Sequence, residues 1–374
     1  MPPIGLYQNI IIDLKNIPGW RTSRKIIIVE CDDWGGIRVP SRDVYQELLK
    51  AGLPIDKSRF RYDTLETKED LEQLFAVLTS VKDKNGHNAI MTPVTNTANP
   101  DFEKIRQSDF TEYYFEKYTS TLLKSGRCDG IFNLWREGMR AGIFVPELHG
   151  RDHITVQLWL QKLREGNKNL LVAFNNGVVS LEVPGINPAA LGFRPEFYFN
   201  SDSQKQFLKI SIKQGVTLFE EIFGYIPRVF VPSNGIFHPD FEDVVAESGV
   251  KFLHVSHSMP YPVNGGALKY RHFITGQKGP GGLTYYTRNC AFEPTDVRYK
   301  NIDLTMKQIA GAFRWYKPAN ICTHRVNFVG GISPVNRVYG LTELKKLLKA
   351  IVRKWPDVEF MSSGDALEYM RKLN

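Results

Sequence analysis

The sequence predicts an α/β fold with a largely parallel sheet or barrel. Short apolar runs of strand length alternate along the chain with longer segments of helical periodicity, the pattern of repeating β-α units. The 374 residues can bury a large core, and 42% of them are hydrophobic and 24% charged, as in an ordinary globular protein. The mean hydropathy of −0.28 agrees with this class. Together these observations exclude disordered and fibrous chains.

The strand candidates are apolar runs that end at polar or turn residues, and the helix candidates place apolar residues on one face. In chain order, the expected strands are Lys25 to Val29, Asn88 to Val94, Gly142 to Leu148, Val229 to Val231, Lys251 to Val255, Asn320 to Thr323 and Val358 to Met361. The expected helices are Ser41 to Ala51, Lys68 to Lys82, Thr155 to Arg164, Ser203 to Phe223, Pro239 to Ser248 and Leu341 to Lys354.

Two stretches interrupt this rhythm, Asn167 to Phe199 and Ser258 to Thr295, and we expect long loops or insertions there. The glycines between Gly276 and Gly282 lack the Gly-Lys-Ser/Thr ending of a phosphate-binding loop. No composition shift marks a boundary, so we expect residues 1–374 to form a single elaborated domain.

Charge and cysteine content narrow the classes of partner and compartment. The net charge of 48 − 40 = +8 is scattered, without the clustered basic and aromatic residues of a nucleic-acid-binding surface. Four dispersed cysteines fit a reducing compartment. No run reaches the ~18 apolar residues of a membrane span, and the N-terminus does not resemble a signal peptide. We therefore expect a cytoplasmic protein that has no transmembrane segment and does not bind nucleic acid.

Asp32 and Asp33 follow the first apolar strand and precede two glycines. At this position a parallel strand delivers side chains to the carboxyl edge of a sheet or barrel. A turn that begins at Asp32 would bring both carboxylates into one cavity, where a cation would be needed to keep them ionised together. Alternatively, both side chains cap the following turn.

His149 and His153 lie four residues apart where an apolar run gives way to a helical pattern. On a helical turn, this spacing puts both imidazoles on one face, where they can bind one cation. Glu147 and Asp152 could orient the imidazoles or lie on a solvated turn. Two histidines and one carboxylate leave coordination positions open, which is typical of a catalytic metal rather than a structural one.

His324 ends another apolar strand, and Pro232 to Gly235 follow a third. If the strands are parallel, His324 emerges beside Asp32 and Asp33 as a candidate general acid. The loop around Ser233 and Asn234 can turn backbone N–H groups toward a pocket, although an ordinary turn would look the same. We expect His238, His254, His257 and His272 to be structural or surface residues.

Taken in order, these segments resemble the polysaccharide deacetylase family, the NodB-homology fold of carbohydrate esterase family 4. Asp32-Asp33 is similar to its paired-aspartate motif, and His149-Gly-Arg-Asp-His153 to its His-x-x-x-His motif. Pro232 to Gly235 resembles its Pro-aromatic-Gly loop, and His324 its late strand histidine.

The resemblance implies a distorted (β/α)7 barrel with helical and loop insertions and one divalent metal ion, usually zinc. In it, Asp33, His149 and His153 would bind the metal, Asp32 would be the general base and His324 the general acid. Backbone N–H groups at Ser233 or Asn234 would hold the oxyanion. The family often has an arginine that orients the base where this chain has Phe230, so Arg38, Arg151 or Arg228 would have to replace it.

The resulting expectation is a metal-dependent hydrolase that removes an N-acetyl group from an amino sugar of a polysaccharide or its precursor. One alternative is a metal-dependent hydrolase of another C–N bond or of an O-acetyl ester. Another is a carbohydrate-binding relative without turnover, for which 45 aromatic residues offer stacking surface.

Overall fold

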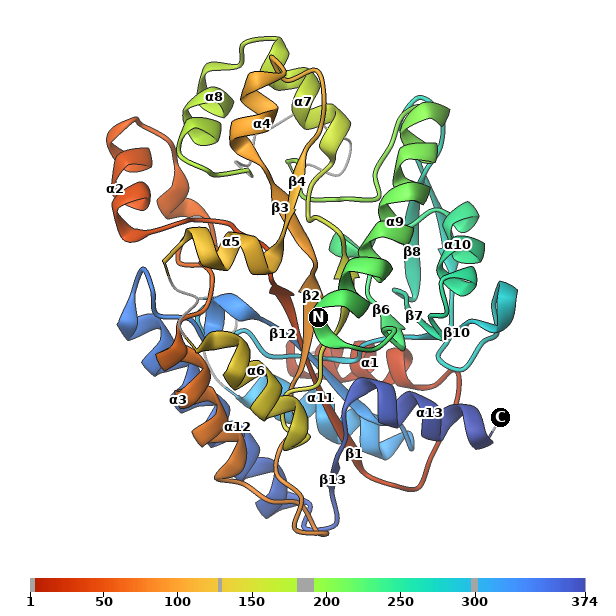
Figure 1. The fold of residues 1–374 in the computed structure, drawn as a ribbon. Coiled ribbons are helices and arrows are strands. Elements are labelled where there is room, and N and C mark those ends of the chain that lie inside the picture. The colour runs from red at the N-terminus through yellow and green to blue at the C-terminus, as the bar shows by residue number, and fades with distance from the viewer. Residues whose placement is uncertain (1–3, 127–129, 180–191, 297–301, 374) are drawn as a thin grey trace.

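The computed structural model describes residues 4–126, 130–179, 192–296 and 302–373 (Figure 1). Its centre is a nine-stranded sheet in which every strand pair is parallel. In spatial order, eight of the strands are β10 (Thr284–Tyr286), β7 (Phe252–His254), β6 (Val229–Phe230), β5 (Glu147–Gly150), β2 (Thr92–Asn96), β1 (Ile26–Trp34), β12 (Ala319–His324) and β11 (Cys290–Ala291), while β13 (Glu359–Phe360) pairs with β1.

The two ends of this sheet are close together because the chain joins them directly. β10 and β11 lie at opposite ends of the strand order, yet only residues 287–289 separate them in sequence. A linker of this length spans at most about 14 Å, so the sheet must curve round on itself. The predicted α/β barrel-like fold is thus confirmed. The described part of the main sheet has nine strands, of which β6, β11 and β13 have only two residues each.

Helices pack around the sheet and beyond its strand ends. Their bounds are α1 (Ile4–Asn16), α2 (Arg42–Lys50), α3 (Lys68–Thr79), α4 (Phe102–Gln107), α5 (Tyr118–Lys124), α6 (Ile131–Arg140), α7 (Val156–Arg164), α8 (Lys168–Asn175), α9 (Asp202–Phe223), α10 (Glu242–Glu247), α11 (Asp303–Arg314), α12 (Pro334–Lys354) and α13 (Ser363–Leu373). None of the helices in these described ranges is long and apolar enough to cross a lipid bilayer.

β1 shows how the strands divide their side chains between two faces. Ile27, Val29 and Cys31 belong to a buried cluster with residues of α3, α6 and α12, so they face outward. Ile28 packs against Ala366 of α13, and Glu30 is bonded by Tyr286 of β10 and Ser363 of α13, so the even-numbered positions face the interior of the barrel. Since alternate residues of a strand share a face, Asp32 follows Ile28 and Glu30 on the inner side.

A separate group of elements lies beyond the carboxyl ends of the central strands, at the top of Figure 1. It contains α4, α7, α8 and the antiparallel pair β3 (Ala98–Pro100) and β4 (Phe115–Lys117). Its own apolar cluster is built around Ile105, Trp159 and Phe174. This cluster positions the chain segment that follows β5.

The structure corrects the expectation for the stretch from Ser258 to Thr295. Instead of a loop, the stretch contains the antiparallel pair β8 (Ser258–Pro262) and β9 (Leu268–His272), followed by β10 and β11 of the main sheet. The stretch from Asn167 to Phe199 includes α8, and its residues 180–191 lie outside the described part of the chain. The other expected strands are present, with ends shifted by a few residues.

Candidate metal centre

Asp33, His149 and His153 come together at the carboxyl ends of β1 and β5. One ligand atom from each lies within 4.8 Å of the other two. The Nε2 atoms of His149 and His153 are 3.6 Å and 3.2 Å from Oδ1 of Asp33. Ligands bonded to zinc at 2.0–2.2 Å in a tetrahedron are about 3.4 Å from one another, so these separations fit one metal ion.

The two imidazoles present the correct nitrogen to such an ion. Nδ1 of His149 lies 2.7 Å from the carbonyl of Val231, and Nδ1 of His153 lies 2.8 Å from the carbonyl of Arg194. A carbonyl only accepts, so Nδ1 carries a proton in each ring, and Nε2 is the nitrogen on the side of Asp33. Burial lowers the pKa of His153 to about 4, which keeps its ring neutral at physiological pH.

The prediction that a helical turn brings His149 and His153 to one face is wrong. β5 ends at Gly150 and α7 begins only at Val156, so His153 is not on a helical turn with His149. The chain instead leaves β5 at Gly150, whose φ of 151° is unfavourable for residues with a Cβ. A Cβ there would also lie 2.1 Å from Oε2 of Glu196.

A break in strand alternation lets Asp32 and Asp33, although consecutive, both interact with His149. The pairing of β1 with β2 shifts register between Cys31 and Trp34, and Asp33 has a left-handed φ of 74°. Such a bulge re-aims one side chain relative to the strand. Oδ2 of Asp33 also accepts a 2.8 Å bond from Arg38. Burial opposes ionisation of Asp33, but neighbouring groups, the Arg38 guanidinium first among them, hold its pKa well below its usual range.

Asp32 is held by a different arginine. Nη1 and Nη2 of Arg288 bond its two carboxylate oxygens at 2.6 Å and 2.7 Å, a bidentate pair. Burial raises the pKa of Asp32, but Arg288 lowers it by more, so the carboxylate is ionised. Nε of Arg288 bonds Glu30, which also accepts bonds from Tyr286 and Ser363. Asp32 is therefore fixed in one orientation by a buried chain of ionic bonds.

None of the three arginines expected to orient the base does so. Arg38 binds Asp33, Arg151 binds Asp152 and Arg228 pairs with Asp365. Arg288 was missed because it lies in the stretch from Ser258 to Thr295. The sequence signal for it was the run Thr284-Tyr-Tyr-Thr-Arg288, whose β-prone residues continue a strand.

His324 lies on the neighbouring strand, paired in register with Asp32. Its Nδ1 bonds Oε1 of Glu293 at 2.5 Å, and Asn327 donates to the other oxygen of Glu293. Burial lowers the pKa of His324, but Glu293 raises it by more, to about 9. The imidazole is therefore protonated at neutral pH and can donate a proton.

Glu293, Cys322 and His324 form a second group with metal-ligand spacing. Arg288 lies 3.2 Å from Sγ of Cys322, and burial raises the pKa of this thiol. A permanent cation next to a protonated thiol disfavours a metal ion at this position. The cluster of Asp33, His149 and His153 is the better candidate.

The loop after β6 forms a 3-10 turn from Ser233 to Gly235, with Asn234 in a left-handed conformation. The buried Ser233 hydroxyl accepts a bond from the Glu196 backbone, whereas the Asn234 side chain is exposed. Within the described ranges, the backbone N–H groups of Ser233 and Asn234 have no bonded acceptor. They are free to bind an external acceptor.

His254 ends β7, two strands from His149, and was expected to be structural or at the surface. Its neighbour Leu253 packs in the outer cluster and Phe252 in the inner one, so alternation turns His254 inward. Its Nδ1 is buried and unpartnered among the described residues, and burial keeps its pKa well below the ordinary value. His254 thus lies on the same inner side of the sheet as Asp32, with which it interacts electrostatically.

No protein-family model matches this chain, and no curated protein is detectably similar to it in sequence. Solved structures do share its fold. A glycoside hydrolase/deacetylase of Parabacteroides distasonis has a TM-score of 0.50 at 10% identity, covering 94% of this chain and 72% of that one.

Two further structures are less similar. A 4-α-glucanotransferase of Thermococcus litoralis has a TM-score of 0.47 at 10% identity over 92% of this chain, which spans only 40% of the glucanotransferase. A polysaccharide deacetylase of Mycobacterium smegmatis has a TM-score of 0.43 at 12% identity, covering 95% of this chain and 93% of that one. At these identities, the likeness concerns the fold alone.

Proposed function

We propose that this chain is a metal-dependent hydrolase that removes an N-acetyl group from an amino sugar of a polysaccharide or its precursor. The observation that carries the proposal is the position of an arginine-held carboxylate, Asp32, between a metal-ligand cluster and a protonated histidine. Hydrolysis of an amide uses these three groups: a base, a proton donor and a site for a Lewis acid.

Asp33, His149 and His153 would hold one divalent metal ion, and their nitrogen and carboxylate donors favour zinc. When bound, such an ion polarises a carbonyl and makes water more acidic. These three residues lie at or just after the carboxyl ends of β1 and β5.

The chain's own residues account for the proton transfers. Asp32 accepts a proton from the water that attacks the amide carbonyl. The backbone N–H groups of Ser233 and Asn234 donate to the oxyanion that develops on the carbonyl oxygen. His324 then donates its proton to the departing nitrogen as the C–N bond breaks, which leaves acetate and a free amine.

The charged state of His324 favours an amide over an ester as substrate. An amine is a poor leaving group unless it is protonated, whereas an alkoxide can leave with less help. Glu293 holds the pKa of His324 at about 9, a value that suits protonation of an amine at neutral pH. Hydrolysis of an O-acetyl ester is therefore the second candidate.

The test is to incubate the zinc-loaded protein with N-acetylated and O-acetylated oligosaccharides and to measure acetate and free amine separately. We expect equimolar acetate and amine from an N-acetylated substrate, loss of both after chelation, and recovery after zinc is restored. Acetate without amine would identify an esterase. Glycan binding with release of neither product, in the zinc-loaded protein, would identify the carbohydrate-binding alternative.

A further inference from the structure

His254 lies at the same level of the sheet as the candidate metal ligand His149. Across β5, β6, β7 and β10, the residues paired in register are Leu148, Phe230, Leu253 and Tyr285, and all four belong to one outer apolar cluster. The residues one position further are therefore level with one another on the inner side: His149, Val231, His254 and Tyr286. Neighbouring strands are about 4.8 Å apart, so the backbones of His149 and His254 are about 10 Å apart.

The imidazole of His254 has unused hydrogen-bonding capacity. Within the described ranges, neither of its ring nitrogens has a hydrogen-bond partner. Nδ1 is fully buried, but the residue as a whole is only partly buried, and Nε2 is the nitrogen that is not fully enclosed. In His149, His153 and His324, by contrast, Nδ1 bonds an oxygen of the protein. His254 is thus the histidine of this region that has a nitrogen left for a ligand.

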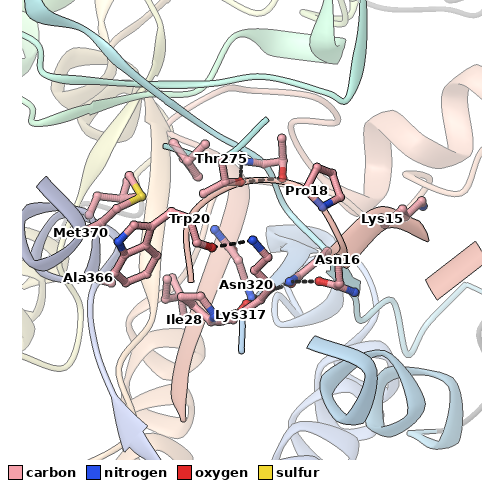
Figure 2. A pocket seen from close by; sticks show the side chains of 15 residues that line it. Lys15, Asn16, Pro18, Trp20, Ile28, Thr275, Lys317, Asn320, Ala366 and Met370 are labelled. Atoms are coloured by element: carbon pink, nitrogen blue, oxygen red, sulfur yellow. Dashed lines mark hydrogen bonds between the residues drawn. The ribbon is translucent and has the colours of Figure 1, made fainter. Parts of the chain in front are cut away.

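The open nitrogen of His254 belongs to the end of the sheet that carries the candidate metal centre. A second cavity, of about 40 Å³, lies on the inner side of the sheet (Figure 2). Its lining includes Ile28, which precedes Asp32 by four residues, or about 13 Å along a strand. His254 is not one of the fifteen residues that line it. It interacts electrostatically with Arg288, Asp32 and His149 instead.

The surroundings of His254 favour a neutral ligand with a hydroxyl group. The guanidinium of Arg288 disfavours a further cation there, and the carboxylate of Asp32 disfavours an anion. Burial first, and then Arg288, hold the pKa of His254 well below its ordinary value, so the ring is neutral. A neutral imidazole has one donor and one acceptor nitrogen. A hydroxyl both donates and accepts, so it can bond Nε2 whichever nitrogen carries the ring proton.

We propose that Nε2 of His254 hydrogen-bonds a hydroxyl group of the amino sugar and thereby positions the substrate at the candidate metal centre. This inference rests on the proposed function and adds a residue that the proton transfers do not use. The hydroxyl is one close to the acetamido group, because β6 lies between β5 and β7. β6 leads into the turn at Ser233 and Asn234 that is proposed to hold the oxyanion.

The test is steady-state kinetics of zinc-loaded variants on an N-acetylglucosamine oligosaccharide. In His254→Ala, KM should rise about five- to tenfold, the size of one hydrogen bond, with kcat and zinc content unchanged. The amide of His254→Gln reaches the position of Nε2, so this variant should restore KM to within about twofold of the wild type. The amide of His254→Asn ends at the position of Nδ1, so this variant should behave as His254→Ala does. His272→Ala changes an exposed histidine and should match the wild type.

Analogues of the oligosaccharide that lack the 3-hydroxyl or the 6-hydroxyl identify the bonded group. For one of them, the wild type and His254→Ala should have the same KM, because the hydrogen bond is already absent. Circular dichroism checks folding, and the pair His254→Gln and His254→Asn decides the matter if His254→Ala does not fold.

Two kinds of failure are distinguishable. If the wild type releases acetate and amine, the inference is wrong when KM is unchanged in His254→Ala, when kcat falls instead of KM rising, or when His254→Asn restores KM as well as His254→Gln. It is also wrong when both deoxy analogues keep the full difference in KM. If the zinc-loaded wild type releases no acetate from any N-acetylated oligosaccharide, the proposed function itself fails, and this inference fails with it.

Discussion

Asp32 and Asp33 are consecutive residues with separate surroundings. Oδ1 of Asp33 faces the imidazoles of His149 and His153, and Oδ2 accepts from Arg38, which also binds Asp63. Asp32 has both oxygens occupied by Arg288 and lies in register with His324. One carboxylate is thus arranged to bind a cation with its free oxygen, and the other to keep its charge and orientation. A register shift within β1 is therefore enough to give two consecutive carboxylates different partners.

Removal of a metal ligand should give the largest effect. In His149→Ala, the Nε2 donor is lost, and zinc measured by inductively coupled plasma mass spectrometry should fall from one equivalent per chain to near zero, with all acetate release. His87→Ala changes an exposed histidine and should retain both zinc and activity. Full zinc content in His149→Ala would show that the ion lies elsewhere, with Glu293, Cys322 and His324 as the next candidates.

Asp32→Asn should separate the two aspartates. The amide keeps the shape of the side chain but cannot accept the proton, so acetate release should fall by about 10²–10⁴-fold while zinc content stays at one equivalent. Asp33→Asn should instead lower zinc content. Asp240→Asn provides the control, because Asp240 is a half-exposed surface residue. Loss of zinc from Asp32→Asn and not from Asp33→Asn would reverse the assigned roles.

The same two residues show what the sequence can predict. Asp32, Asp33, His149, His153 and His324 were found because each stands at or just after the end of a strand, and strand ends share one edge of a parallel sheet. The partners that tune them come from far away. Arg288 is 256 residues from Asp32, and Glu293 is 31 residues from His324. A local sequence pattern cannot predict contacts between residues so far apart. In addition, the glycines between Gly276 and Gly282 led to the prediction of a loop where β10 leads to Arg288.

Arg288, which bonds Asp32, and Arg38, which bonds Asp33, should differ in their effects on kcat and on zinc affinity. Arg288→Lys keeps the charge but loses the bidentate bond, and we expect a 10- to 100-fold lower kcat with unchanged zinc affinity. Arg38→Lys should weaken zinc binding about tenfold, because Arg38 orients the ligand Asp33. Competition with a zinc chelator measures the affinity, and steady-state kinetics measures kcat. Equal effects of both variants on zinc affinity would mean that the two arginines serve one shared site.

The smallest effect at neutral pH is expected at the proton donor. Because His324 has its pKa raised to about 9 by Glu293, its protonated form should persist up to that pH, and kcat/KM should decline only as the pH rises through about 9. In Glu293→Gln, the imidazole loses its anionic partner, so the decline should move toward the ordinary histidine pKa of about 6.5. The protonated fraction of an imidazole falls tenfold for each pH unit above its pKa. The rate of Glu293→Gln should therefore be a few-fold lower than that of the wild type at pH 7 and about 100-fold lower at pH 8.5. If the wild type and Glu293→Gln gave the same pH profile of acetate release, His324 would not be the acid. Glu293 affects the proposed reaction only through its bond to His324.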